Sequence, residues 1–83
     1  MKASVEISMY PLKEEYVAEI KEFIARLKNN DSIECQVNGM STQIFGDYRR
    51  IMEILTNEIA VSYEKEGKFV FVMKVINGYL KKQ

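Results

Sequence analysis

The amino-acid sequence predicts an α+β fold in which the elements run strand, helix, strand, strand, helix, strand. Three observations support this order: alternating apolar and polar residues near the N-terminus, two segments with apolar residues at helical spacing, and a strongly apolar run near the C-terminus. A chain of 83 residues fits one domain, so we expect residues 1–83 to form a single domain. Such a domain buries only about 60% of the surface of its unfolded chain, so association with further copies would add stability.

The first strand and the first helix have the clearest patterns. From Ala3 to Met9 every second residue is apolar, which indicates a strand. Pro11 predicts that this strand ends near Tyr10, because proline has no backbone N–H. Between about Lys13 and Lys28 the apolar residues recur at steps of three and four, which predicts an amphipathic helix.

The middle of the chain predicts two strands joined by a tight turn. Apolar and polar residues alternate from Ile33 to Val37, and the following Asn38-Gly39 favours a hairpin turn. The third strand is expected to start near Met40 and to stop at Gly46, where glycine permits an unusual backbone angle.

The remaining elements are a second helix and a last strand. Asp47 is expected to cap a helix over Tyr48–Tyr63, and Gly67 follows its end. The run from Phe69 to Ile76 is apolar at consecutive positions, so both faces of this strand are apolar. We expect a second subunit to cover the face that the helices leave open, in a dimer or a tetramer.

This order of elements is that of the ferredoxin-like fold, a four-stranded antiparallel sheet with both helices on one face. In that topology the first and third strands are central neighbours. We therefore expect the hydroxyls of Ser8 and Thr42 to lie close together across the ladder, where they could share one ligand.

Charge and hydropathy exclude several partners. Lysine plus arginine equals aspartate plus glutamate, at 12 each, so no net field attracts nucleic acid or an anionic membrane. No window approaches the roughly 20 apolar residues of a membrane span, and the N-terminal residues lack a signal-peptide pattern. The single cysteine, Cys35, cannot form an intrachain disulfide. We expect a cytoplasmic protein.

Catalytic constellations are missing from the sequence. With no histidine, serine–histidine and cysteine–histidine catalysis and imidazole metal ligation are excluded, and the glycines form no phosphate loop. Cys35 shares the apolar face of its predicted strand with Ile33 and Val37, so we interpret it as a core residue and not as a reactive thiol. Glu6 and Glu34 fall on the opposite face, where they either face solvent or pair with a cationic ligand. We expect no enzyme, no metal and no cofactor.

A set of hydroxyl, amide, methionine and aromatic side chains gathers near the predicted strand ends. Such groups beside an apolar wall can form a small-molecule pocket, in which a few donors and acceptors orient the ligand. The alternative is that these residues only serve turns and strands. The candidate binding residues are Ser8, Tyr10, Asn38, Met40, Ser41, Thr42 and Phe45.

Two motifs in these segments resemble the YkoF-like thiamine-binding family. The motifs are Ser8-Met9-Tyr10-Pro11-Leu12 at the end of the first strand and Met40-Ser41-Thr42-Gln43-Ile44-Phe45-Gly46 in the third. The resemblance extends over almost the whole chain, because both helices and the final strand fall where the family has them. Departures occur at the charged start of the second helix, Asp47 to Arg50, and at the short C-terminus.

The resemblance implies a ferredoxin-like domain that binds thiamine or its hydroxymethylpyrimidine moiety and serves salvage or transport of the vitamin, without catalysis. Hydroxyls of Ser8, Ser41 or Thr42 and the Asn38 amide would satisfy the edge of the aminopyrimidine ring. Some members of the family hold two such domains in one chain, so a site that needs both would be completed here by association of copies. The competing hypothesis is an oligomeric structural or regulatory module that binds a protein partner and no small ligand.

Overall fold

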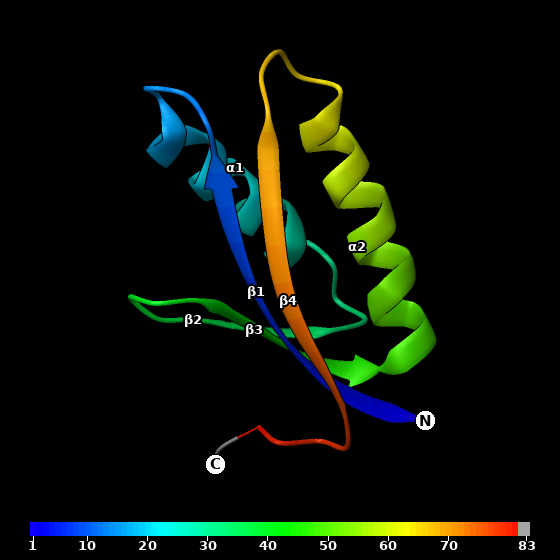
Figure 1. Ribbon diagram of the computed structural model, residues 1–83. Coiled ribbons are helices and arrows are strands. Elements are labelled where there is room, and N and C mark those ends of the chain that lie inside the picture. Colours follow the sequence, from blue (N-terminus) through cyan, green and yellow to red (C-terminus); the bar gives the residue numbers. More distant parts are fainter. Residues whose placement is uncertain (82–83) are drawn as a thin grey trace.

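The computed structural model, which describes residues 1–81, contains the six predicted elements in the predicted order. Figure 1 shows their arrangement along the chain. The elements are β1 (Lys2–Pro11), α1 (Tyr16–Lys28), β2 (Glu34–Val37), β3 (Thr42–Asp47), α2 (Tyr48–Tyr63) and β4 (Phe69–Asn77).

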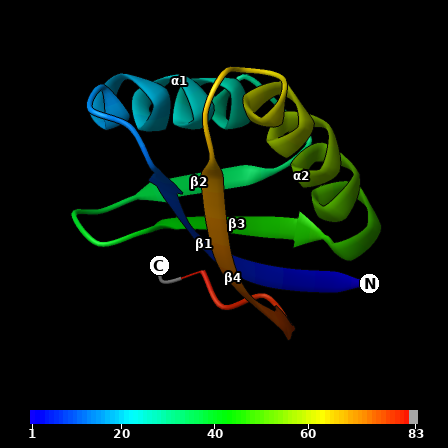
Figure 2. The ribbon, with the colours of Figure 1, turned by 45° about the horizontal axis from the view of Figure 1, so that its top comes forward.

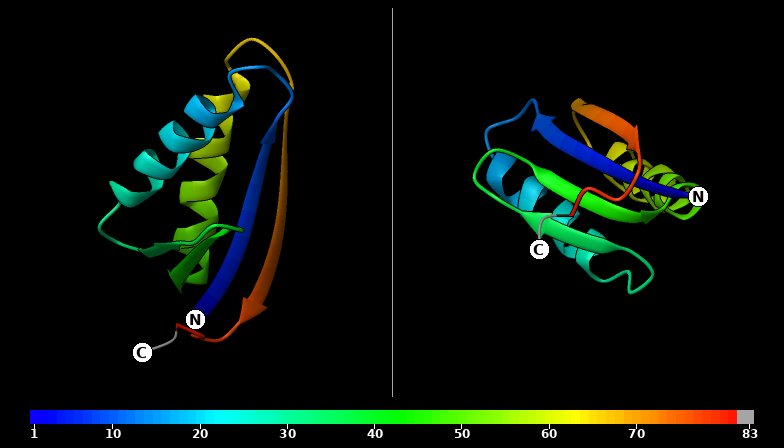
Figure 3. Two further views of the ribbon diagram at one scale, coloured as in Figure 1. Left: turned by 90° about the vertical axis from the view of Figure 1, so that its left-hand side faces the viewer. Right: turned by 90° about the horizontal axis from the view of Figure 1, so that it is seen from below.

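The strands form one four-stranded antiparallel sheet in the order β2-β3-β1-β4. Both helices cover the same face, and Figure 3 shows the opposite face free of helices. The sheet is strongly twisted, so that the β2–β3 hairpin runs across the direction of β1 and β4 in Figures 1 and 2. This is the ferredoxin-like arrangement predicted from the sequence.

The first strand is longer than expected, because Pro11 is accommodated at its end. Pro11 pairs with Phe69 of β4, and the next residue, Leu12, donates its backbone N–H to the Lys68 carbonyl at 2.9 Å. Backbone groups alternate sides along a strand, so the N–H that proline lacks would have pointed away from β4. The chain then turns before α1, which begins at Tyr16 and not near Lys13.

The core lies between the sheet and the two helices. Its strand residues include Val5, Ile7 and Ile44, and the helices contribute Leu27 and other apolar side chains. Cys35 packs against this cluster, as its alternation predicted. Burial raises the pKa of the Cys35 thiol, so the reactive thiolate is disfavoured.

Asp47 caps α2, as predicted. Its side chain accepts a hydrogen bond from the Arg50 backbone N–H at 3.1 Å and another from the N-terminal ammonium at 3.1 Å. The Arg50 N–H and the N-terminal ammonium together hold the pKa of the Asp47 carboxyl below its usual value. The start of β1 is therefore joined to the junction of β3 and α2.

The last strand exposes apolar side chains on both faces. Val72 lies on the helix-free face and is 54% exposed, while Val75 lies on the helix-covered face and is 45% exposed. The outer edge of β4 has no neighbouring strand among residues 1–81. The exposed apolar surface of β4 thus includes the helix-free face, as expected, and also the part of the helix-covered face around Val75.

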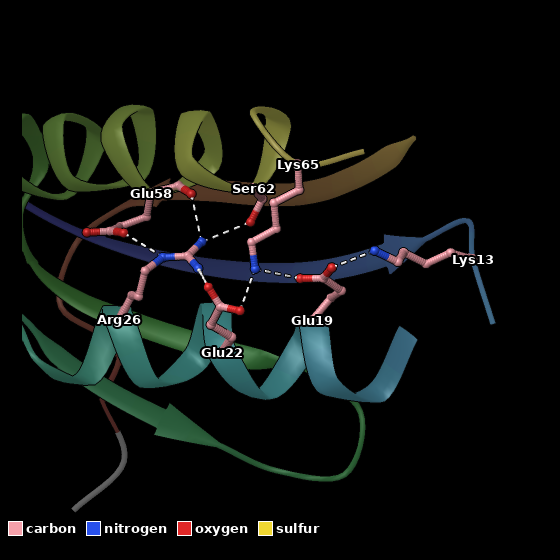
Figure 4. A network of polar contacts seen from close by, with 7 residues as sticks. All are labelled: Lys13, Glu19, Glu22, Arg26, Glu58, Ser62 and Lys65. Atoms are coloured by element: carbon pink, nitrogen blue, oxygen red, sulfur yellow. Dashed lines mark hydrogen bonds and ion pairs between the residues drawn. The ribbon is translucent and has the colours of Figure 1, made fainter. Parts of the chain in front are cut away.

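The two helices are joined by a network of charged side chains (Figure 4). Arg26 of α1 donates to Glu58 at 2.8 Å and to the buried Ser62 hydroxyl at 2.9 Å, both on α2. Lys65, just after α2, pairs with Glu19 at 2.8 Å and with Glu22. Hydrogen bonds from lysine lower the pKa of both glutamates: from Lys13 and then Lys65 at Glu19, and from Lys65 at Glu22.

A core substitution in α2 tests the packing of the helices on the sheet. Leu55 is 1% exposed, so Leu55→Ala is expected to reduce the free energy of unfolding by about 2–5 kcal/mol, through lost burial and a residual cavity. Val61→Ala in the same helix, at a position 39% exposed, is the control and should change it by no more than about 0.5 kcal/mol. Urea unfolding of both variants makes the comparison, and equal losses would contradict the assigned helix face.

The interhelical network predicts an acid-sensitive contribution to stability. Because the folded-state pKa values of Glu19 and Glu22 lie below 4.5, their pairing with Lys65 stabilises the fold at neutral pH and is lost as the pH falls through the lowered values. Lys65→Met should therefore be less stable than the parent at pH 7, and this difference should shrink towards pH 3.

Urea unfolding at several pH values measures the effect of Lys65→Met. Lys21→Met, which removes a lysine of α1 that makes no ion pair within residues 1–81, is the control for loss of charge alone. A difference between parent and Lys65→Met that stayed constant from pH 7 to pH 3 would contradict this assignment.

Candidate functional site

A pocket of about 180 Å³ opens at one end of the sheet, between α1, the second half of β1 and the tip of the β2–β3 hairpin. Its wall combines side chains of the apolar core with polar residues of the hairpin. The lining residues are Ile7, Ser8, Met9, Tyr10, Ile20, Phe23, Ile24, Val37, Asn38, Gly39, Met40, Ser41 and Thr42.

The pocket exists because β1 is longer than the strand beside it. Pairing between β1 and β3 ends at Ile7 and Thr42, whereas β1 continues to Pro11 beside β4. In Figure 1 the hairpin tip lies at the left, and the far end of β1 extends above it, next to α1. The space that a longer β3 would fill is therefore left open.

The hairpin tip is held by the side chain of Asn38. Its Oδ1 accepts hydrogen bonds from the backbone N–H groups of Met40 at 2.8 Å and Ser41 at 3.0 Å, and the Asn38 N–H donates to the Ser41 carbonyl at 3.1 Å. The Ser41 hydroxyl donates to Glu6 at 3.1 Å. The turn leaves the Met40 side chain 90% exposed at the rim.

Six of the seven residues predicted for the site line this one pocket: Ser8, Tyr10, Asn38, Met40, Ser41 and Thr42. Phe45 does not. Phe45 pairs with Ser4, away from the end of the β1–β3 ladder where the pocket opens, and its ring packs against Tyr79 on the helix-free face at a centroid distance of 5.8 Å. The strand pairing therefore separates Phe45 from the other candidates.

In contrast to the prediction from the sequence, the structure does not place the Ser8 and Thr42 hydroxyls side by side across the ladder. Thr42 pairs with Ile7, so its side chain lies on the helix-covered face with the core. Ser8 is the next residue along β1, and its side chain points to the helix-free face. The two residues are near each other in the sheet, but a shift of one position places their hydroxyls on opposite sides of it.

The sequence did not indicate the wall that α1 contributes. Ile20, Phe23 and Ile24 belong to the apolar stripe of the helix, and this stripe predicted core packing alone. Nothing in its spacing distinguishes a residue that covers the sheet from one that covers a gap in the sheet. The end of the β1–β3 pairing at Ile7 and Thr42 decides which helix residues cover the pocket and which cover the sheet.

The pocket is uncharged, because none of its lining residues is a lysine, arginine, aspartate or glutamate. The two strand carboxylates considered in the sequence lie outside it. Glu34 bonds to Tyr79 and Lys81, and these hydrogen bonds, Lys81 first, lower the pKa of its carboxyl. Glu6 accepts from Ser41 and lies 3.6 Å from Lys74. The pocket thus suits the neutral part of a ligand.

A second hollow, of about 350 Å³, lies on the helix-free face under the C-terminal segment. Ser4 holds that segment in place, since its hydroxyl donates to the Gly78 carbonyl at 2.8 Å and accepts from the Leu80 N–H at 2.8 Å. The lining includes Phe45, Ile76 and Leu80, but only one of the candidate residues. The first pocket is therefore the stronger candidate site.

Two further properties concern possible partners. Among residues 1–81, no helix has the length and apolar character that crossing a bilayer requires. Over the same residues, histidine, cysteine, aspartate and glutamate side chains form no group of three that could hold a metal ion.

Known structures resemble this fold over most of its length. Protein SP2199 of Streptococcus pneumoniae matches with a TM-score of 0.86 at 24% identity, covering 96% of this chain and 90% of that chain. For the hypothetical protein MJ1052 of Methanocaldococcus jannascii the TM-score is 0.78 at 24% identity, with 98% and 84% covered. At these identities the similarity establishes the fold alone.

A third structure concerns thiamine. Protein TM0486 of Thermotoga maritima, assigned provisionally to thiamine biosynthesis or salvage, has a TM-score of 0.80 at 18% identity, with 90% of this chain and 82% of that chain covered. Comparison with curated proteins finds no match. The sequence pattern of the YkoF-related family matches residues 2–77. Since that match spans nearly all of the sequence, the chain belongs to the YkoF-related family.

Proposed function

We propose that this protein binds thiamine or its hydroxymethylpyrimidine moiety in the pocket between α1 and the end of β1, in salvage or transport of the vitamin. The observation that supports this most is the convergence of the motif residues of β1 and β3 on one uncharged pocket. Membership of the YkoF-related family and the fold shared with a protein assigned provisionally to thiamine metabolism support the same ligand class.

The size of the pocket limits which part of the ligand enters it. Pockets for drug-sized ligands have volumes of about 300–1,000 Å³. The pocket here measures about 180 Å³, which suits a single substituted ring better than the two rings of thiamine. The neutral pyrimidine would lie inside, and the positively charged thiazolium ring would lie outside, near the exposed Met40.

The walls match the faces and the edge of such a ring. Phe23 and Met9 provide apolar and polarizable surface for the ring faces, and Tyr10 stands at the rim. The Thr42 hydroxyl makes no hydrogen bond within residues 1–81, so it is available to a polar edge of the ligand. The Asn38 amide NH₂ is also available, whereas its oxygen is used in the turn.

The proposed activity is binding without chemical change, in the cytoplasm. The pocket lining contains no carboxylate, lysine, arginine or cysteine that could act as an acid, a base or a nucleophile. Turnover of thiamine or its phosphates by the purified protein would contradict this proposal. The alternative, an oligomeric module for a protein partner, would gain support if no pyrimidine raised the melting temperature.

The exposed apolar surface of β4 favours a second copy of this chain as its partner. Among residues 1–81 the strand has one unpaired edge, and it carries apolar side chains on both faces, a combination that favours pairing with another strand. Formal charges of the whole chain sum to zero, so long-range repulsion between copies is small. We therefore propose a homo-oligomer, a dimer or a tetramer, that covers β4.

A pair of hydroxyl deletions tests the site. Thr42→Val keeps the side-chain shape and removes the free hydroxyl, so hydroxymethylpyrimidine binding should weaken by about 0.5–1.5 kcal/mol, or roughly two- to twelvefold. Ser8→Ala is the matched control, because its hydroxyl faces the other side of the sheet and its affinity should stay within about twofold of the parent's. Calorimetric titration provides both affinities. Weaker binding by Ser8→Ala alone would place the ligand on the helix-free face.

A charge introduced into β4 tests the oligomer. Val72→Asp places a carboxylate in the exposed apolar surface, and the oligomer should dissociate because burying that charge at an interface is unfavourable. Val61→Asp, on the exposed side of α2, is the control and should leave the mass unchanged. Light scattering at micromolar concentration measures the masses. A monomeric parent would contradict the proposal.

A further inference from the structure

The backbone of β1 directs its hydrogen-bonding groups in a fixed alternation. The backbone N–H and C=O groups of even-numbered residues point towards β4. The Gly78 N–H donates to the Lys2 carbonyl at 3.0 Å, and the Leu12 N–H donates to the Lys68 carbonyl at 2.9 Å. The backbone groups of odd-numbered residues point towards β3, as the hydrogen bond from the Tyr48 N–H to the Met1 carbonyl at 2.8 Å shows. The N–H and C=O of Met9 therefore point away from β4, towards the side on which β3 lies.

Among residues 1–81, no strand residue pairs with Met9 on that side. The last pair of the β1–β3 ladder is Ile7 with Thr42, and continuation of this register would place Met40 opposite Met9. Met40 instead belongs to the hairpin turn, where its N–H donates to Asn38 Oδ1 at 2.8 Å. Within residues 1–81, the backbone N–H and C=O of Met9 have no hydrogen-bond partner.

These two groups border the pocket. Met9 lines it together with Thr42 and with the hairpin residues that replace the missing strand neighbour. Met9 as a whole residue is 8% exposed, so little of its surface, main chain included, is open to solvent. A buried backbone donor and acceptor side by side require a partner, and a bound ligand can supply it.

We propose that the Met9 main chain recognises the amidine edge of an aminopyrimidine. The Met9 N–H would donate to a ring nitrogen, and the Met9 carbonyl would accept from the adjacent exocyclic amino group. A ligand edge with one acceptor beside one donor thus replaces the residue of an opposing strand, as peptides do when they add to a sheet. This inference rests on the proposed function and specifies how the same site selects its ligand.

The proposal predicts discrimination against a 4-oxo pyrimidine. When oxygen replaces the amino group, the ring nitrogen becomes a donor and the exocyclic oxygen an acceptor. With the ring in the same orientation, the Met9 N–H would then face a ring N–H, and the Met9 carbonyl would face the ligand's carbonyl oxygen. Leaving two backbone groups unpaired in a small pocket is expected to weaken binding by about ten- to a hundredfold. Size and shape of the ligand hardly change.

Calorimetric titration of the parent protein with hydroxymethylpyrimidine and with its 4-oxo analogue tests this directly. Tight binding of the first and weak binding of the second is the expected result. Equal affinities for both would overturn the role of Met9 and leave the proposed function intact. Binding of neither compound would overturn the proposed function and this inference together.

Amide hydrogen exchange provides a second readout that does not depend on the choice of analogue. In the free protein the Met9 N–H should exchange much faster than the Ile7 N–H, which is paired with β3 in the same strand. Saturating hydroxymethylpyrimidine should slow exchange at Met9 and leave Ile7 nearly unchanged. Exchange at Met9 as slow as that at Ile7 in the free protein, or unaffected by bound ligand, would overturn the proposal.

Discussion

The unequal pairing of β1 on its two sides is the constraint on which the rest of this structure depends. One side pairs with β4 from Ala3 to Pro11, whereas the other pairs with β3 only from Lys2 to Ile7. Backbone groups buried in a protein require hydrogen-bond partners. A central strand that continues beyond the end of its neighbour therefore leaves unpaired N–H and C=O groups inside an apolar domain. The pocket, its lining and the free groups of Met9 all follow from this difference in length.

The helix that closes the pocket is positioned by charges on its other side. Phe23 of α1 faces the sheet, while Glu22 and Arg26 of the same helix bind residues of α2 and of the segment after it (Figure 4). Exposed ion pairs contribute little singly, but Arg26 reaches the buried Ser62, so part of this network is shielded from water. The network thus connects α1 to α2, while the lining of the pocket itself contains no charged side chain.

Motif residues and pocket residues are related through the hairpin turn. Asn38 has a structural role, since its side chain organises the turn that removes Met40 from the ladder. Ser41 is bonded to Glu6 on the helix-free face, so it connects the turn to β1. Only some of the polar residues at the strand ends are then available to a ligand, and Thr42 is among them. The motif thus contains residues that build the pocket and residues whose polar groups remain free to meet a ligand.

The sequence by itself determined the order and type of the elements, because periods of two and of three to four are local properties of the chain. It also determined the cap at Asp47, the turn at Asn38 and the core role of Cys35, each of which depends on residues close in sequence. Tertiary structure alone decided which hydroxyls share a face. A register shift of one residue separates Ser8 from Thr42, and register depends on pairing between distant segments. The position of Phe45 follows from the same register, whereas the wall formed by α1 and the free backbone of Met9 follow from where β3 ends beside β1.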